Sequence, residues 1–282
     1  MPKIIDLRVR PPIGSFLDLH IYARGAEKSV VHKSHPPSAS FTQRSMKLLL
    51  EEMDAAQVIG VIMGRQGAKK YGHVSNDEIA AIVRDNPGRF IPFAGVQLAD
   101  PARAVDEVER AIKELGFVGV NLEPGFDERP VRADDRSLYP IYEKCKELKV
   151  PVSISMSVRI GPDLTYADPL AIQHVCTDFP DVKFISSHAC WPYVQEIIGV
   201  AWVCTNLYVS PDFYMAIEHM PFAGEFVNAA NLFLDDRLLF GSAYPVRAID
   251  ECISTFNKLP FKSQAIKNRI LYDNAAALFG LE

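Results

Sequence analysis

Three charged residues stand at alternate positions in an otherwise apolar stretch near the start of the chain. The stretch reads Ile4-Ile5-Asp6-Leu7-Arg8-Val9-Arg10. Side chains two apart on a β-strand share a face, so the spacing predicts that Asp6, Arg8 and Arg10 point one way and the apolar residues the other. Pro11 and Pro12 remove two backbone donors and end the strand. Two guanidinium groups on one face offer forked donors that suit a carboxylate, so the stretch predicts an anion site.

Further polar side chains follow the other predicted strands at the point where each strand ends. They are Arg65, Gln97, Glu123, Ser155, His188, Asp212 and Tyr244. An imidazole beside a carboxylate can carry a proton, so His188 with Glu123 or Asp212 forms the predicted catalytic group. The same three side chains are also ligand types for a divalent metal ion, and a relocated metal at Glu123, His188 and Asp212 is a smaller alternative.

The predicted substrate-binding residues are the donors and rings around that catalytic group. They are Arg8, Arg10, Arg65, Ser155, Trp191 and Tyr244. We expect Arg8 to be tied to Asp6, and Arg10, which lies nearer the end of the strand, to be reachable by a ligand. A purely structural ion cluster, in which Asp6 and Glu123 pair with the arginines, is the alternative to an anion site.

The elements that must position these residues alternate along the chain, as short β-branched runs followed by longer runs of helical period. This pattern is typical of parallel βαβ units. The eight predicted strands are 4–10, 58–63, 90–96, 118–122, 152–156, 183–188, 207–210 and 237–241. The predicted helices are 43–56, 76–86, 101–115, 137–148, 169–179, 192–200, 222–234, 246–257 and 264–279. Eight such units predict one (β/α)8 TIM barrel over residues 1–282, with its active site at the carboxyl ends of the strands.

Local signals support several of these boundaries. Ser75 and Glu78 have the spacing of a capping box at the start of a helix. Pro101 suits the first turn of the next helix, and Gly116 suits the left-handed residue that ends it. Residues 11–42 are too long for an ordinary βα loop and are rich in Pro, Ser and His, so we expect a lid or a subunit contact there.

The composition excludes several classes of protein. The chain has 282 residues, of which 48% are hydrophobic and 23% charged, and its formal net charge is -5. This balance gives no basic surface for nucleic acid, and no apolar run is long enough for a membrane span. No signal segment precedes the first strand, and the five cysteines form no C-x-x-C pair. We therefore expect a cytoplasmic protein whose partner is a small molecule.

The start of the chain resembles the amidohydrolase-related branch of the amidohydrolase superfamily. That branch opens with an apolar strand ending in Asp-x-His-x-His-Pro, whose two histidines bind the catalytic metal. This chain keeps Asp6 and Pro11 but has Arg8 and Arg10 at the two histidine positions. The resemblance implies a TIM barrel, a homo-oligomer, and a hydrolase or carbon–carbon lyase of the decarboxylase type.

The resemblance extends to later strands. Residues 151–155 are similar to the fifth strand of the family, with Ser155 where a histidine ligand often stands, and residues 185–188 are similar to the sixth, with His188 kept. Residues 237–245 are similar to the eighth strand, where Ala243 replaces an aspartate that serves as metal ligand and general base. Residues 270–280 are similar to the closing helix.

Arginine at the metal-binding positions predicts that the usual zinc site is lost. At an effective dielectric constant of 20 and about 5.5 Å, a divalent ion and one guanidinium repel by roughly 6 kcal/mol. Guanidinium groups do not deprotonate in proteins, so the arginines are expected to replace the metal with fixed positive charge. The sequence thus predicts an enzyme, a hydrolase or carboxy-lyase, acting on a small carboxylate-bearing substrate. A non-catalytic carboxylate binder on a retired hydrolase barrel is the main alternative.

Overall fold

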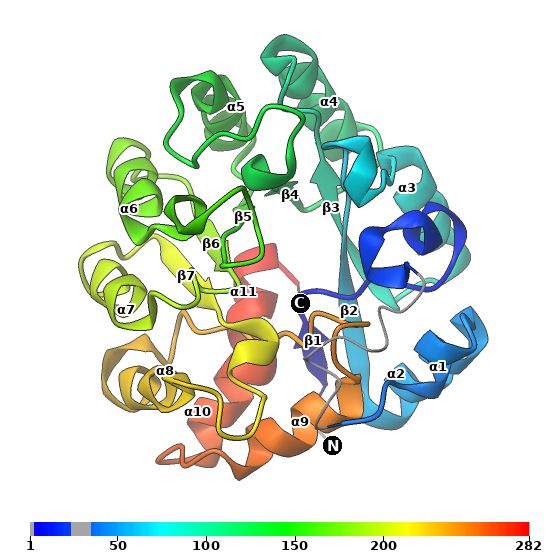
Figure 1. The fold of residues 1–282 in the computed structure, drawn as a ribbon, viewed down its shortest axis with the longest axis vertical. Coiled ribbons are helices and arrows are strands. Elements are labelled where there is room, and N and C mark those ends of the chain that lie inside the picture. Colours follow the sequence, from blue (N-terminus) through cyan, green and yellow to red (C-terminus); the bar gives the residue numbers. More distant parts are fainter. Residues whose placement is uncertain (1–2, 24–34, 282) are drawn as a thin grey trace.

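Seven parallel strands, in the order β1 to β7, form the central sheet of the computed structural model, which describes residues 3–23 and 35–281. The strands are β1 (Ile4–Asp6), β2 (Val58–Met63), β3 (Phe90–Gly95), β4 (Gly119–Leu122), β5 (Val152–Ser155), β6 (Phe184–Ser187) and β7 (Leu207–Ser210). Figure 1 shows these strands around a central axis with the helices outside them. The bounds of β2 and β7 are those predicted from the sequence.

Residues 237–245 close the barrel between β7 and the chain that follows β1. Val209 forms a parallel bridge with Leu238, and the Leu7 N–H donates to the Phe240 carbonyl at 3.0 Å. The predicted eighth strand is therefore present as isolated bridges rather than as a regular ladder. With this closure the predicted (β/α)8 barrel is confirmed.

Eleven α-helices lie in the described part of the chain. They are α1 (Ala39–Thr42), α2 (Met46–Ala56), α3 (Asn76–Asp85), α4 (Pro101–Lys113), α5 (Tyr139–Leu148), α6 (Pro169–Asp178), α7 (Val194–Val203), α8 (Ala223–Ala229), α9 (Ile249–Lys258), α10 (Gln264–Asn268) and α11 (Asn274–Phe279). The π-helical turn η10 (Ala230–Leu234) extends α8, and η11 (Arg269–Asp273) joins α10 to α11. Ser75 caps α3 as predicted, since the Glu78 N–H donates to Ser75 Oγ at 3.2 Å, whereas the Glu78 carboxylate accepts from the Ser15 N–H at 2.7 Å. None of the described helices is both long and apolar enough to span a bilayer.

The barrel interior has an apolar layer and, nearer the carboxyl ends of the strands, a polar layer. In the apolar layer inward side chains of β1, β2, β3 and β6 pack against α11, and the Phe93 and Phe279 rings lie 5.2 Å apart between centroids. In the polar layer Ser153 Oγ lies 2.8 Å from Ser187 Oγ and donates to Asn121 Oδ1 at 3.3 Å. Barrel interiors are filled in such layers, so the polar site rests on a packed floor.

The first strand does not alternate in the predicted way. Ile5 and Leu7 lie in the apolar cluster inside the barrel, so Asp6 between them points away from the axis. The prediction that Asp6 shares a face with Arg8 and Arg10 is wrong. The chain bends at Leu7, and this bend resets the alternation so that the Arg8 side chain turns inward.

Asp6 instead joins the first strand to the segment that closes the barrel. Its Oδ1 accepts hydrogen bonds from the backbone N–H groups of Arg8, at 3.1 Å, and Ser242, at 2.9 Å. Its Oδ2 accepts from the Ser242 hydroxyl at 2.5 Å. Burial raises the pKa of Asp6 to about 6, although these hydrogen bonds oppose the shift. The ionised carboxylate of Asp6 thus lowers the stability of the folded protein at neutral pH.

Asp6→Asn is expected to flatten the pH dependence of stability. Because the pKa of Asp6 is raised in the folded state, its contribution to stability is complete below about pH 4 and is lost as the pH rises through about 6. A shift of about two pKa units corresponds to at most ~3 kcal/mol. Urea unfolding at pH 4.5 and pH 8 measures the difference between wild type and variant. The same pH dependence in both proteins would contradict this account of Asp6.

The predicted long loop, 11–42, contains short helical turns where it is described. These are η1 (Gly14–Asp18), η2 (His20–Tyr22) and α1, while residues 24–34 lie outside the described part. The Tyr22 hydroxyl donates to the Arg10 carbonyl at 2.6 Å and so ties η2 to the end of the first strand. The loop therefore brings new side chains to the mouth of the barrel.

Candidate active site

The guanidinium group of Arg8 lies at the barrel axis, surrounded by polar groups from three strand ends. Nη1 donates to Glu123 Oε1 at 3.1 Å, and Nη2 donates to Ser155 Oγ at 2.5 Å and to Asn121 Oδ1 at 3.4 Å. Nε lies 3.8 Å from Asp212 Oδ2. The prediction that Arg8 pairs with Asp6 through its side chain is wrong, because the Asp6 carboxylate meets Arg8 at its backbone N–H and not at its guanidinium. Arg8 is an internal counter-ion whose donors are largely occupied.

Arg65 and Glu123 form a two-pronged ion pair beside Arg8. Arg65 Nη2 donates to Glu123 Oε1 at 2.8 Å, and its Nε pairs with the other carboxylate oxygen. Burial by itself would raise the pKa of Glu123, but the charges of Arg65 and Arg8 hold it well below the usual range. Glu123 is therefore ionised at neutral pH and anchors two arginines, and its role in proton transfer stays a prediction.

His188 and Asp212 form a second buried pair on the opposite side of Arg8. His188 Nδ1 lies 2.8 Å from Asp212 Oδ2, and the Ser210 hydroxyl donates to Asp212 Oδ1 at 2.5 Å. Both residues have left-handed backbone angles, with φ of 70° at His188 and 51° at Asp212. Burial lowers the pKa of His188 against the opposing effect of Asp212, so the imidazole is predominantly neutral without ligand at neutral pH. An imidazole and a carboxylate in this geometry can carry a proton.

Arg10 differs from the other two buried arginines because its partners are carbonyl groups. Nη1 donates to the carbonyl oxygens of Ala243, at 3.2 Å, and Tyr244, at 3.4 Å. Arg10 is buried, with only 8% of the residue exposed, yet within the described residues no carboxylate lies within 4.0 Å of its guanidinium. Burial, together with the positive charges of Arg8 and Arg65, lowers the pKa of Arg10 to about 9. Such a cation can bind an anionic ligand by donating charge-assisted hydrogen bonds.

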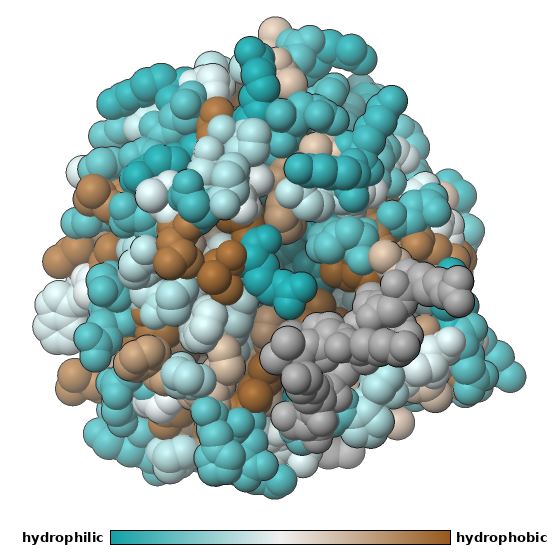
Figure 2. Space-filling model, viewed as in Figure 1, coloured by the Kyte–Doolittle hydropathy of each residue, from teal (hydrophilic) through white to brown (hydrophobic). Residues whose placement is uncertain are grey.

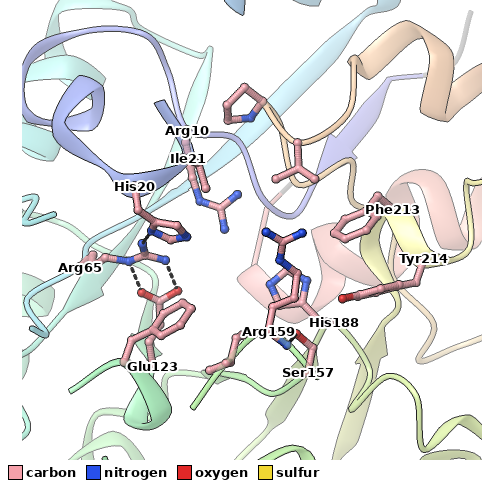
Figure 3. Close-up of a pocket in the computed structure, with 14 residues that line it drawn as sticks. Arg10, His20, Ile21, Arg65, Glu123, Ser157, Arg159, His188, Phe213 and Tyr214 are labelled. Carbon is pink, nitrogen blue, oxygen red and sulfur yellow. Dashed lines mark hydrogen bonds and ion pairs between the residues drawn. The ribbon is translucent and has the colours of Figure 1, made fainter. Parts of the chain in front are cut away.

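A cavity of about 170 Å³ opens above these groups at the carboxyl ends of the strands. Its walls include the charged or polar residues Arg10, His20, Arg65, Glu123, Ser157, Arg159 and His188, and the apolar or aromatic residues Ile21, Phe126, Ile160, Phe213, Tyr214, Pro245 and Val246. Figure 3 shows the side chains of Arg10, Arg65, Arg159 and His188 gathered around one space. Figure 2 shows the same face of the molecule hollowed near its centre. The cavity suits a small organic acid with an apolar body.

The other predicted site residues lie around the cavity rather than in its wall. Ser155 is buried below it, bonded to Arg8. Tyr244 is fully buried, with its hydroxyl 2.7 Å from Ser40 Oγ. Trp191 stacks on Tyr214 with centroids 4.9 Å apart and so supports the wall from behind. Gln97 lines a separate groove beside α3 and α4.

Three polar wall residues, along with the apolar and aromatic ones, were missed by the reasoning from sequence. Ser157 and Arg159 continue the two-residue spacing of Ser153 and Ser155 beyond the end of β5, and this spacing could have pointed to them. His20 lies in the long loop, where no periodic pattern exists. Only the folding of that loop over the barrel brings His20 to the site.

The described residues do not fit a divalent metal ion at the place that the family resemblance implies. Arg8 and Arg10 occupy the expected histidine positions, and the Arg8 guanidinium lies between the carboxylates of Glu123 and Asp212. A metal relocated to Glu123, His188 and Asp212 would have to displace that guanidinium. In residues 3–23 and 35–281 no group of three or more His, Cys, Asp and Glu side chains is placed to hold a metal. The central positive charge here is supplied by arginine.

Comparison with known proteins places this architecture in a family. A family model described as amidohydrolase matches residues 22–281. A gamma-resorcylate decarboxylase from Polaromonas sp. is 27% identical over 266 residues, covering 80% of this chain and 81% of the relative. A crystal structure of a TIM-barrel protein from Bordetella bronchiseptica is 40% identical, with a TM-score of 0.93 and coverage of 99% of this chain and 98% of that one.

A more distant structure shares the fold and contains a metal. It is a dihydroxybenzoic acid decarboxylase from Polaromonas sp. with bound manganese and the inhibitor 2-nitroresorcinol, 20% identical, with a TM-score of 0.71 and coverage of 99% and 97%. The family match spans nearly the whole chain, and the relatives that it resembles over most of their length include decarboxylases. The protein is therefore an enzyme that belongs to the amidohydrolase family.

Proposed function

We propose that the protein is a carboxy-lyase that removes carbon dioxide from a small organic acid, using arginine in place of a resident metal ion. The observation that carries the proposal is Arg10, a buried guanidinium at a cavity wall with no carboxylate partner among the described residues. The decarboxylase names of the relatives supply the reaction class. Arginines stand at the positions where the family resemblance implies metal-binding histidines, so the proposed reaction differs from that of the family in its source of positive charge.

The charges of the site favour an anionic substrate. Arg8 and Arg65 are balanced by Glu123 and Asp212, whereas Arg10 and the exposed Arg159 have no carboxylate within 4.0 Å in the described part of the chain. A substrate carboxylate placed against Arg10 restores this balance. The aromatic and aliphatic walls then enclose the rest of the substrate, and a less aqueous site favours loss of a charged carboxylate as neutral carbon dioxide.

His188 is the residue that we assign to proton transfer. When the carbon–carbon bond breaks, the electron pair stays on the substrate carbon, carbon dioxide leaves, and the carbon takes one proton. The charges of Arg8 and Arg10 contribute to the lowered pKa of His188. A bound carboxylate offsets those charges and raises this pKa, so substrate binding itself favours the imidazolium, which can then donate.

Two other functions are less well supported. A hydrolase of this family relies on a metal-activated water, and the guanidinium groups found here do not lower the pKa of a bound water in that way. A non-catalytic carboxylate binder would need no acid–base pair beside its arginines, yet His188 and Asp212 are retained at 2.8 Å. The related decarboxylase, matched over 81% of its length, also favours an enzyme.

The test of this proposal is carbon dioxide release from a panel of hydroxylated aromatic and unsaturated acids by protein purified without a chelator. We expect turnover with metal far below one equivalent by mass spectrometry, and no loss of rate after treatment with a chelator. His188→Gln should reduce kcat by about 10²-fold to 10⁴-fold, the usual contribution of a general acid. Near-stoichiometric metal whose removal abolishes turnover would refute the role given to arginine.

Two predictions from the sequence extend beyond this site. A homo-oligomer and a cytoplasmic location both remain predictions.

A further inference from the structure

His20 is held in the wall of the cavity by an arginine. It lies in η2, and its ring meets the Tyr71 and Phe126 rings edge to face, with centroids 5.6 Å apart in each case. Arg65 Nη1 lies 3.2 Å from His20 Nδ1 and 3.3 Å from the Tyr71 carbonyl oxygen. Arg65 is in turn fixed by Glu123. The ring is therefore oriented by a chain of charged groups that starts at the barrel axis.

The contact with Arg65 determines which ring nitrogen carries the proton. A guanidinium can only donate, so His20 Nδ1 must accept, and a neutral imidazole that accepts at Nδ1 carries its hydrogen on Nε2. The Tyr71 carbonyl lies 3.4 Å from the same nitrogen and accepts a hydrogen bond from Arg65 Nη1 at 3.3 Å. Nε2–H is then the free donor of the ring, and the described residues provide no hydrogen-bond partner for it.

The surroundings also keep the ring uncharged. Burial, together with the positive charges of Arg65 and Arg10, lowers the pKa of His20 to about 4. His20 thus remains a neutral donor throughout the pH range in which most enzymes work. A neutral imidazole is a better match than an imidazolium for sharing a hydrogen with a developing oxyanion without losing its proton.

We propose that His20 is a catalytic residue whose Nε2–H binds the substrate oxygen on which negative charge develops as carbon dioxide leaves. This rests on the proposed function and applies to acids with a hydroxyl or keto oxygen conjugated to the carbon that bears the carboxylate. Arg10 holds the carboxylate and His20 holds the oxygen. Figure 3 shows Arg10, His20 and His188 among the side chains that line the cavity.

The chemistry of that oxygen explains why a donor is needed. The electron pair released from the carbon–carbon bond can delocalise from the carbon onto the conjugated oxygen. A fixed donor at the oxygen lowers the energy of this state more than that of the bound acid, because the charge on the oxygen is greater there. The proton from His188 then ends on the carbon, and the hydrogen on His20 stays with its nitrogen.

Nitrogen NMR of histidine-labelled protein tests the fixed tautomer without any need for turnover. The signals of His20 are identified among the seven histidines by their loss in His20→Gln. We expect the shift pattern of a neutral ring protonated at Nε2 from pH 5.5 to 8. A proton on Nδ1, or an imidazolium at pH 6, would overturn the inference even if the protein proves to be a decarboxylase.

Binding of two matched acids tests the contact with the oxygen. Wild type should bind 2-hydroxybenzoate about 2-fold to 10-fold more tightly than benzoate, since one hydrogen bond between the neutral imidazole and a neutral hydroxyl is worth roughly 0.5–1.5 kcal/mol. His20→Phe should abolish this preference and leave benzoate binding unchanged, while His20→Gln, which keeps an N–H donor, should retain part of it. An equal loss for both acids would mean that His20 only shapes the wall. These titrations remain informative if no turnover is found.

Discussion

Arg10→Met is expected to abolish the binding of small carboxylates and with it any turnover, while the unliganded protein stays nearly as stable as wild type. The substitution keeps the apolar stem and removes the guanidinium. Two charge-assisted hydrogen bonds of roughly 1.5–3 kcal/mol each are lost to the ligand, which corresponds to a fall in affinity of about 10²-fold to 10⁴-fold. The fold gives up only two hydrogen bonds to carbonyl groups.

Thermal unfolding with and without added benzoate measures both effects. Benzoate should raise the melting temperature of wild type by mass action and leave that of Arg10→Met unchanged. Arg10→Lys is the matched control, because it keeps the charge but loses the fork, and it should restore part of the shift. If benzoate and larger acids give no shift with wild type, the guanidinium is not an anion site and the proposed substrate class fails.

Arg8→Met is expected to have the largest effect on the fold itself, a loss of about 3–5 kcal/mol in the free energy of unfolding. Arg8 is 2% exposed and contacts two buried carboxylates, Glu123 and Asp212. Its removal leaves Asp212 without a neighbouring fixed cation and leaves Glu123 with Arg65 alone. Urea unfolding at pH 7 gives the magnitude.

Double substitutions identify the partner whose loss of pairing causes the damage. Asp212→Asn in the Arg8→Met background should recover part of the stability, because it removes the uncompensated charge. Asp6→Asn should change the stability of Arg8→Met by the same amount as it changes that of wild type, since the Asp6 side chain meets only the backbone of Arg8. A recovery by Asp6→Asn that exceeds its effect in wild type, with none by Asp212→Asn, would mean that the original sequence-based pairing is correct.

The sequence predicts the barrel well because its signals are local and repeated. β2 and β7 have the predicted bounds, and α3 and α6 each end within one residue of them. α2 begins three residues later than predicted, since Ser45 caps it and accepts from the Leu48 N–H. Boundaries of this kind depend on a few neighbouring residues, which periodicity and capping signals report.

The candidate site is predicted less completely because its contacts join distant parts of the chain. The common location of Arg10, Glu123 and His188 follows from the rule that strand ends meet at one rim, and the structure brings them to one cavity. The partners of Arg8 cannot be predicted from that rule, because a single bend at Leu7 determines which way Asp6 points. His20 reaches the site through the tertiary path of an irregular loop, for which no periodic rule exists.

The guanidinium at the barrel axis has a consequence for how the protein acquires its charge. A bound ion must be captured from the surroundings after the chain folds, so the active fraction of such a protein follows the ion's supply. Here Arg8 is part of the polypeptide, and each molecule carries the full central charge as soon as it has folded. If arginine replaces the metal as proposed, the protein needs no loading step, and metal scarcity or replacement by a competing metal leaves its central charge unchanged.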